Sequence, residues 1–317
     1  MMKEFNDLNE MRELAEKLFS AIPGIKDAAS VESIEVSNLN AHDFKTKFID
    51  NNTPCLIKGA IDHWPAIEKW KKKEYWINTC ENKEITIIPN INFFDLTKRM
   101  ESGEKLLFHN ALNRLFNNFD HIFSIPGQFV GDGTLYSNLA NDIGNFSFLP
   151  FPEKPLWDGE KSLFIYRRAA TTWHVHYCDE TLMCQVNGAK LVAIIPPPKF
   201  RAPYITHFLE NELYLKGQVI DKNLQLDPKI VEVKEGDALY IPPGWFHCVV
   251  PINGDIGFTL ACNSKSPLHI NGNLSNYFTR RLYKKAWSVP SIKVKMSIPI
   301  YLFKAMCSYY FRKIMTF

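Results

Sequence analysis

Three histidines of this 317-residue chain have the types and spacing of metal ligands. His174 and His176 are two residues apart in an apolar segment, and a β-strand would place such a pair on one face. His247, arriving from a distant strand, would complete a three-point site that leaves coordination positions open for chemistry. Three neutral imidazoles would leave a divalent ion a strong Lewis acid. The alternative is that these are ordinary histidines of a buried sheet.

Two side chains that follow compete with His176 for the second ligand position. In an unbroken strand Cys178 shares the ligand face and is a conceivable soft ligand. Asp179 would lie on the opposite face and could reach the metal only after a turn or a bulge. We therefore rank His176 first, Asp179 second and Cys178 third.

The second half of the chain has the pattern of a β-domain. Short β-rich segments bounded by turns occupy residues 162–166, 172–177, 182–186, 190–195, 230–233, 238–241, 246–251 and 257–262. Eight strands at this spacing predict an antiparallel barrel or jelly roll. The expected fold is mainly β with flanking helices.

Three regions are expected along the chain. Residues 1–30 contain an amphipathic helix over positions 5–21, and residues 31–267 form the β-rich domain. Residues 268–317 return to a helical pattern that is both basic and apolar.

Around the first two histidines this chain reads Thr171-Thr-Trp-His174-Val-His176, then Gln185-Val-Asn-Gly188-Ala-Lys190, then an apolar run to Pro196. These motifs resemble those of the JmjC, or cupin-8-like, Fe(II)/2-oxoglutarate oxygenases. That family shows Thr-x-x-His-x-Asp, then Gln-x-x-Gly-x-Lys, then an apolar strand that ends in proline. The first motif is therefore similar, with His176 standing where the family has aspartate.

The sequence around the third histidine resembles the same family more closely. Gly236-Asp-Ala-Leu-Tyr-Ile-Pro-Pro-Gly-Trp-Phe-His247 matches the pattern Gly-Asp-x-x-Tyr-Ile-Pro-x-x-Trp-x-His at full spacing. Pro54-Cys-Leu-Ile-Lys-Gly59 is similar to the segment at which the family's domain begins. The resemblance covers about residues 34–265. It implies a double-stranded β-helix core, a jelly roll of the cupin type.

The resemblance also implies a co-substrate site. Lys190 would bind the distal carboxylate of 2-oxoglutarate, and an inward-facing lysine needs such an anionic partner. Thr171 would hydrogen-bond the same carboxylate, Tyr136 matches a co-substrate position more loosely, and Asn263 matches a polar residue near the metal. Lys190, Tyr136 and Asn263 each have a structural alternative: a surface lysine, a core aromatic and a strand-end asparagine.

The exchange of aspartate for His176 bears on the activity that the resemblance implies. It removes a negative charge from the metal site, which should weaken Fe(II) binding and favour other divalent metals. The expected activity is an Fe(II)/2-oxoglutarate-dependent dioxygenase that hydroxylates a protein side chain or a small molecule. The alternatives are a three-histidine cupin enzyme that uses no 2-oxoglutarate, and a catalytically inactive binding or scaffold protein.

The charge of the chain is unevenly distributed. Residues 256–317 carry ten Lys/Arg and no Asp/Glu, whereas the first 255 residues hold 27 Lys/Arg and 34 Asp/Glu. A basic, aromatic C-terminal segment favours packing on the domain, a homodimer through 268–317, or contact with a membrane surface. Its cations are spread among large apolar side chains, a pattern that disfavours nucleic acid.

Cysteine content and hydropathy indicate where the chain would reside. Seven cysteines form no paired short spacing, which favours free thiols in a reducing compartment. The first residues lack the apolar core of a signal peptide, and no uncharged apolar run reaches 18 residues. We therefore expect a cytoplasmic protein, with association to a membrane surface as the variant that the basic segment suggests.

Overall fold

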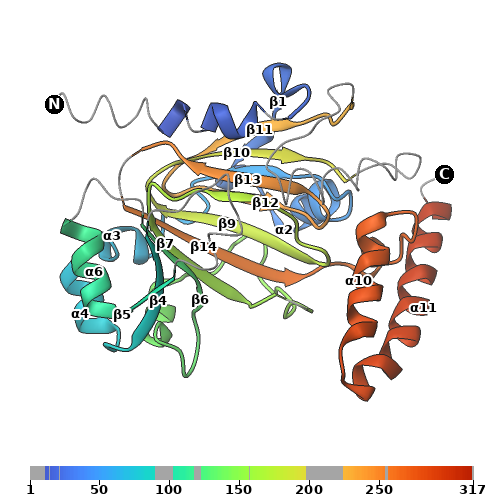
Figure 1. Cartoon of the computed structure of the whole chain (residues 1–317). Coiled ribbons are helices and arrows are strands. Elements are labelled where there is room, and N and C mark those ends of the chain that lie inside the picture. The colour runs from blue at the N-terminus through green and yellow to red at the C-terminus, as the bar shows by residue number, and fades with distance from the viewer. Residues whose placement is uncertain are drawn as a thin grey trace.

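A computed structural model of the whole chain places most of the molecule. The structure describes residues 11–13, 15–20, 22–89, 103–117, 123–156, 158–197, 224–253 and 256–315. Two β-sheets lie face to face at its centre, with helices at the two ends of the larger one (Figure 1).

The strands form one five-stranded and one nine-stranded sheet. The smaller has the order β1 (Ala29–Ser30), β11 (Lys229–Val233), β10 (Lys190–Ile195), β13 (Phe246–Pro251) and β8 (Thr171–His174). The larger has the order β2 (Glu32–Glu35), β3 (Cys55–Lys58), β12 (Ala238–Ile241), β9 (Asp179–Asn187), β14 (Ile256–Lys265), β7 (Lys161–Arg167), β6 (Phe123–Phe129), β4 (Glu84–Pro89) and β5 (Glu104–Leu107).

The eight strands predicted from the sequence correspond to β7–β14. All pairings among them are antiparallel, whereas β1 and β2 pair in parallel with β11 and β3. The two facing sheets are a double-stranded β-helix of the cupin type, which confirms the predicted fold class. The predicted strand 172–177 is shorter than expected, because β8 ends at His174.

Alternation along β9 shows how the larger sheet separates two environments. Leu182, Cys184 and Val186 belong to the main hydrophobic core. Thr181 and Gln185 point to the other face, toward the smaller sheet, because successive side chains of a strand alternate. All residues of β9 except the last are buried, so both faces of this central strand are covered.

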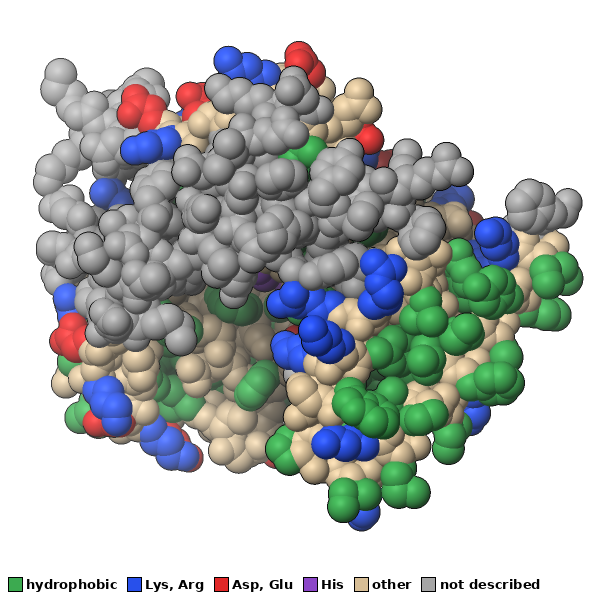
Figure 2. Space-filling model, turned by 45° about the vertical axis from the view of Figure 1, so that its right-hand side comes forward, with side chains coloured by type: hydrophobic (Ala, Val, Ile, Leu, Met, Phe, Trp, Pro, Cys, Tyr) green, Lys and Arg blue, Asp and Glu red, His purple; other side chains and the backbone are tan. Residues whose placement is uncertain are grey.

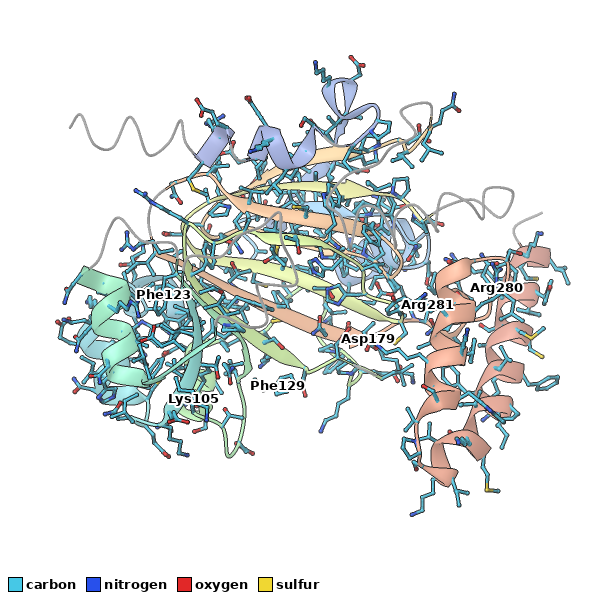
Figure 3. All side chains as sticks on the ribbon, in the orientation of Figure 1. Lys105, Phe123, Phe129, Asp179, Arg280 and Arg281 are labelled. Carbon is cyan, nitrogen blue, oxygen red and sulfur yellow. The ribbon has the colours of Figure 1, made fainter. Side chains whose placement is uncertain are left out.

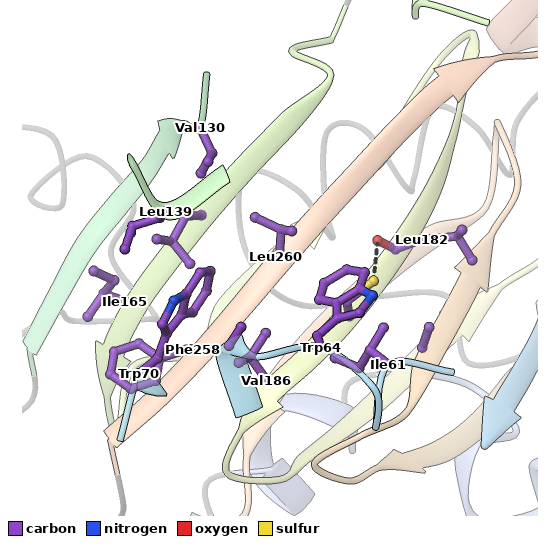
Figure 4. Close-up of a cluster of buried hydrophobic side chains, with 14 of the residues drawn as sticks. Ile61, Trp64, Trp70, Val130, Leu139, Ile165, Leu182, Val186, Phe258 and Leu260 are labelled. Carbon is purple, nitrogen blue, oxygen red and sulfur yellow. Dashed lines mark hydrogen bonds between the residues drawn. The ribbon is translucent and has the colours of Figure 1, made fainter. Parts of the chain in front are cut away.

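The main core covers the outer face of the nine-stranded sheet. Helices α3 (Ala66–Lys69), α4 (Lys73–Thr79) and α6 (Phe108–Asn117) contribute to it. Trp64, Trp70 and Trp76 are at most 2% exposed, and Trp70 packs edge-on against Phe258 of β14 (Figure 4). Each buried tryptophan contributes about 3–5 kcal/mol by comparison with truncation to alanine.

Two smaller hydrophobic clusters pack against the two faces of the five-stranded sheet. On its outer face, Met11, Leu18 and Phe19 of the N-terminal helical segment pack against Trp173 and its neighbours. Residues 5–10 of the predicted helix lie outside the described residues. Between the sheets, aliphatic side chains such as Val192 and Leu239 form a third cluster. The polar residues described below share this inter-sheet space.

Several short helical segments complete the domain. They are η1 (Ile25–Asp27), η2 (Val36–Asn38), α2 (Ala41–Asp43), the π-helix η3 (Phe44–Ile49) and η4 (Ser137–Asp142).

Three helices follow β14 and stand beside one end of the nine-stranded sheet (Figure 1). They are α9 (Leu268–Asn271), α10 (Tyr277–Ser288) and α11 (Ile292–Met315). Gly272, at the end of α9, lets α11 pack closely against α9, because a Cβ at this position would lie 2.0 Å from the backbone oxygen of Ala305. Arg312 forms an ion pair with Asp50 at 3.1 Å, which ties the end of α11 to the domain. Among the described residues, no helix is both long and apolar enough to cross a membrane.

Candidate metal centre and co-substrate site

The structure brings His174, His176 and His247 together. One ligand atom of each imidazole lies within 4.8 Å of those of the other two. Ring centroids are 4.0 Å apart for His174 and His247, 5.5 Å for His174 and His176, and 5.4 Å for His176 and His247. A single ion of the size of Fe(II) or Zn(II) can be reached by three such nitrogens after small side-chain adjustments.

Strand pairing aligns the first and third histidines. His174 of β8 lies directly opposite His247 of β13, so the two side chains share a face. Thr171 is paired with Val249, which means that three steps on β8 match two steps on β13. The extra residue on β8 is a β-bulge, which interrupts the regular alternation of side chains between the two faces of the strand. Val249, the partner of Thr171, belongs to the inter-sheet cluster.

His176 reaches the site from a loop and not, as predicted, from the strand. It lies two residues beyond the end of β8. Its backbone carbonyl accepts a 2.8 Å hydrogen bond from the N–H of Gly244, in the turn that precedes β13. Gly244 has φ 83°, a conformation that glycine adopts without strain. The same turn therefore starts the strand of His247 and holds His176 beside it.

Hydrogen bonds orient all three imidazoles. Nδ1 of His174 lies 2.8 Å from the carbonyl of Thr172, and Nδ1 of His247 lies 2.9 Å from the carbonyl of Trp245. A carbonyl only accepts, so Nδ1 carries the proton in both rings and Nε2 keeps the lone pair. Burial, with the neighbouring His174 and His176, lowers the pKa of His247 well below its usual value. The ring is therefore neutral and able to ligate at physiological pH.

A carboxylate stands behind the third imidazole. Nδ1 of His176 lies 3.1 Å from Oδ2 of Asp158. Burial raises the pKa of Asp158, but the hydrogen bond from His176 and nearby positive charges outweigh it, and the net pKa is lowered. Asp158 is therefore ionised. Carboxylates in this position fix the tautomer of a ligating histidine and increase its basicity.

Asp179, the alternative second ligand, supports this arrangement from outside the histidine cluster. Its two carboxylate oxygens accept hydrogen bonds from the backbone N–H groups of Leu156, at 2.7 Å, and Asp158, at 2.9 Å. Figure 3 shows Asp179 at the end of the nine-stranded sheet next to α10. The geometry thus assigns Asp179 to the loop that presents Asp158, and it favours His176 as the second ligand.

Cys178, the third-ranked ligand, also points elsewhere. Its side chain is buried and lies 3.6 Å from Oδ2 of Asp179. Burial and the charge of Asp179 raise the pKa of this thiol, so the thiolate that a metal requires is disfavoured. Cys178 instead lines an apolar cavity of about 540 Å³, whose walls include Leu156, Leu282 of α10 and Ile298 of α11. This cavity lies next to the loop that carries Asp158.

Lys190 shares the inner face of the smaller sheet with the histidines. Ile194 of β10 is opposite His247, and Lys190 lies four residues earlier on the same strand, so both side chains point to the same side. Four residues of strand span roughly 13 Å, so the backbone of Lys190 lies about that far along β10 from the position opposite His247.

The environment of Lys190 is that of a cation without its anion. The residue is 4% exposed, and its Nζ lies 4.1 Å from the ring centroid of Tyr166. No carboxylate among the described residues forms an ion pair with it. Burial lowers the pKa of Lys190 to about 7. A buried ammonium is costly unless an anion compensates it, so this position suits a ligand carboxylate.

Tyr166 is held in place by polar side chains between the sheets. Its hydroxyl accepts a 2.9 Å hydrogen bond from Nε2 of Gln185, whose Oε1 accepts one from Thr259 at 2.9 Å. Its cross-strand partner is Gly257, where a Cβ would lie 1.9 Å from the phenol ring. Gly257 therefore creates the space in which the ring lies against Lys190. The sequence analysis did not single out Tyr166.

The structure does not bring Tyr136 to this group. Tyr136 is fully buried in the main core, with its ring 5.5 Å from that of Phe108 and 6.3 Å from that of Trp76. This is the placement of a core aromatic, the structural alternative. Asn263 accepts a hydrogen bond from Thr181 at 2.8 Å and donates one to the carbonyl of Gly159 at 2.7 Å. Its predicted place near the metal stays a prediction.

Comparison with known proteins agrees with this geometry. A model of the cupin-like domain matches residues 41–270, most of the chain. The chain belongs to the cupin-like domain family. Its JmjC relatives include Jumonji C domain-containing protein 5 of Drosophila melanogaster, which is 24% identical over 220 residues, covering 65% of this chain and 54% of that protein.

Two further relatives of this cupin-like chain carry enzyme names. Arginine-specific demethylase JMJ22 of Arabidopsis thaliana is 24% identical over 249 residues, covering 74% of this chain and 46% of that protein. Bifunctional peptidase and (3S)-lysyl hydroxylase JMJD7 of Homo sapiens is 26% identical over 262 residues, covering 67% and 78%. The chain spans about half the length of the Drosophila and JMJ22 relatives.

The residues present fit a divalent metal of the kind that the cupin-like family implies. Two imidazoles have Nδ1 hydrogen bonds that leave Nε2 available, and the third is backed by an ionised carboxylate. Together they make a suitable donor set. Asp158 also supplies the negative charge that the ligand set lacks, although it contacts His176 and not the metal itself. The metal and the three imidazoles together with Asp158 carry the same formal charge as a metal with two histidines and one carboxylate.

A substitution of Asp158 tests this compensation. We expect Asp158→Asn to weaken Co(II) binding about 10–100-fold, because a neutral amide keeps an acceptor for His176 but loses the charge. The measurement is Co(II) titration followed by visible absorbance. The exposed Asp27→Asn is the matched control and should bind as the wild type does. Equal affinity of Asp158→Asn and wild type would show that Asp158 contributes no charge to the site.

Proposed function

We propose that this chain is an Fe(II)/2-oxoglutarate-dependent dioxygenase that hydroxylates a protein side chain or a small molecule. The observation that carries the proposal is the placement of a buried lysine on the same inner face as a cluster of three oriented imidazoles. Fe(II) with 2-oxoglutarate would supply the chemistry that activates O₂ for insertion into a C–H bond.

The residues of the chain have distinct tasks in this proposal. His174, His176 and His247 would hold the metal, with Asp158 orienting His176. Lys190 would bind the distal carboxylate of 2-oxoglutarate, and Thr171 would assist it from β8. The sheets on both sides exclude water from the reacting centre, which strengthens each of these electrostatic contacts.

The relatives support a side-chain substrate over a small molecule. The human relative is named a lysyl hydroxylase, and the Arabidopsis relative an arginine-specific demethylase. The apolar cavity beside the loop of Asp158 offers room for the apolar part of a substrate. The substrate itself is a matter for experiment, because one fold serves many substrates.

Conversion of 2-oxoglutarate to succinate by the purified protein with Fe(II) under air tests the proposal. We expect slow succinate formation that requires Fe(II), even without a substrate. The substitution of His176 for aspartate favours one competitor, a three-histidine cupin enzyme without 2-oxoglutarate. That enzyme would bind metal but form no succinate. An inactive scaffold would bind neither metal nor 2-oxoglutarate, and either result would contradict the proposal.

A further inference from the structure

The outward face of α11 carries a continuous apolar stripe. Its members follow one another at steps of three or four residues over six turns of the helix. They are Ile292, Met296, Ile300, Phe303, Cys307, Tyr310 and Ile314, each of them exposed. Phe311 and Met315 extend the same face, at 67% and 71% exposed. Figure 2 shows these hydrophobic side chains gathered over the C-terminal helices.

Cations border this stripe on both sides. On a helix with 100° per residue, Lys293 and Lys304 lie along one edge, and Lys295 and Lys313 along the other. No acidic residue occurs in α10 or α11. The opposite face of α11 carries Ala305, which is buried and lies close to Gly272 at the end of α9. The stripe is therefore a separate outer surface and does not form part of the packing of α11 on the protein.

We propose that this stripe docks the protein onto an anionic membrane surface, with α11 lying flat in the interface. Apolar side chains would enter the boundary of the bilayer, while the bordering lysines extend to the headgroups. Residues 292–314 span roughly 33 Å, enough for several lipids along the helix. This membrane contact does not depend on the proposed metal chemistry, so each can be tested without the other.

A second copy of the chain fits the stripe less well. A two-fold symmetric contact places the same patch against itself. It would bring the lysine rows of two α11 helices together, with no acidic residue on either helix to compensate them. Pro299 also lies inside α11, where it removes a backbone hydrogen bond and disfavours the regular seam that helix pairing requires. A fluid bilayer makes no such demand.

Co-sedimentation of the full chain with vesicles tests the proposal. We expect binding to vesicles of phosphatidylcholine mixed with phosphatidylglycerol, at least about tenfold weaker binding to phosphatidylcholine alone, and a decline with added salt. Phe303→Asp should reduce binding at least about tenfold. Phe151→Asp, at a phenylalanine of the β-domain that is 91% exposed, is the matched control and should bind as the wild type does.

Charge is tested by a second matched pair of variants. Lys293→Gln with Lys304→Gln should weaken binding to the anionic vesicles, whereas Lys26→Gln with Lys72→Gln should not. Equal sedimentation of the wild type with and without anionic vesicles would overturn the proposal, and so would unchanged binding by Phe303→Asp. Light scattering gives the other outcome. A wild-type dimer that Phe303→Asp converts to a monomer, without vesicle binding by either, would make the stripe an interface between copies.

Discussion

His247→Ala is expected to lower the affinity for Co(II) or Fe(II) by at least about 100-fold and to abolish Fe(II)-dependent succinate formation. His247 is 2% exposed and has the ring centroid of His174 only 4.0 Å from its own. Its loss leaves two imidazoles, one of them on a loop, and removes the closure of the three-point site. Even partners that only orient a ligand are worth 10–100-fold in metal affinity, and a ligand should be worth at least as much.

His109→Ala provides the control for this experiment. His109 is also a partly buried histidine that hydrogen-bonds a carbonyl, that of Cys80 at 3.2 Å, but it lies on α6 among core residues. The affinity is measured by titration calorimetry with each purified variant. Wild-type metal affinity in His247→Ala would remove the histidine cluster from consideration as the metal site.

Lys190→Met is expected to separate function from stability. The variant should bind 2-oxoglutarate at least about 100-fold more weakly, because the carboxylate loses its buried cation. In the absence of ligand it should be more stable than the wild type, by a few kcal/mol at pH 7. Burial lowers the pKa of Lys190 from its ordinary 10.5 to about 7, and each unit of such a shift corresponds to about 1.4 kcal/mol.

The pH dependence of the wild type follows from the same shift. The pKa of Lys190 in the folded state lies below that in the unfolded chain. Burial of the charged lysine therefore lowers the free energy of unfolding by its full amount below about pH 7, and this destabilisation decreases as the pH rises toward 10.5. Wild-type stability should gain from this residue over that window, and Lys190→Met should not show the gain.

Binding of 2-oxoglutarate should change in the opposite direction. Above about pH 7 the free protein loses the proton of Lys190, so affinity for the dicarboxylate should fall as the pH rises. Lys190→Arg keeps its charge over this range and should bind with a flat pH profile, even if more weakly. Thermal unfolding and calorimetry from pH 6 to 9 measure both quantities. A wild-type affinity independent of pH would contradict the role of Lys190.

Strands and the spacing of their histidines could be predicted because they depend on local patterns. The bounds of β10, β12 and β13 agree with the predicted segments residue for residue. The motif that ends in His247 covers β12, the turn that follows it and the start of β13, and its residues are all close in sequence. The structure places His176 beside His174, as its spacing predicted, but from a loop and not from a strand. Its position depends on a hydrogen bond from Gly244, 68 residues away.

Residues that depend on contacts between distant segments could not be predicted. Asp158 precedes His176 by 18 residues, and Asp179 accepts hydrogen bonds from the loop that carries Asp158. No local spacing records such an arrangement. Tyr166 was not identified from the sequence because it lies in an apolar strand, whose Leu163 and Ile165 face the main core. Its signal was the alternation of β7, which turns residue 166 toward Lys190, and the small residue Gly257 opposite it.

Diffraction from crystals grown with Fe(II) and 2-oxoglutarate without oxygen, recorded at the iron absorption edge, tests the central claim most directly. The account predicts one anomalous peak at ligand distance from Nε2 of His174, His176 and His247, with Asp158 still bonded to Nδ1 of His176. It also predicts a carboxylate of 2-oxoglutarate against Nζ of Lys190. A peak ligated by Asp179 in place of His176, or crystals that bind neither metal nor 2-oxoglutarate, would contradict it.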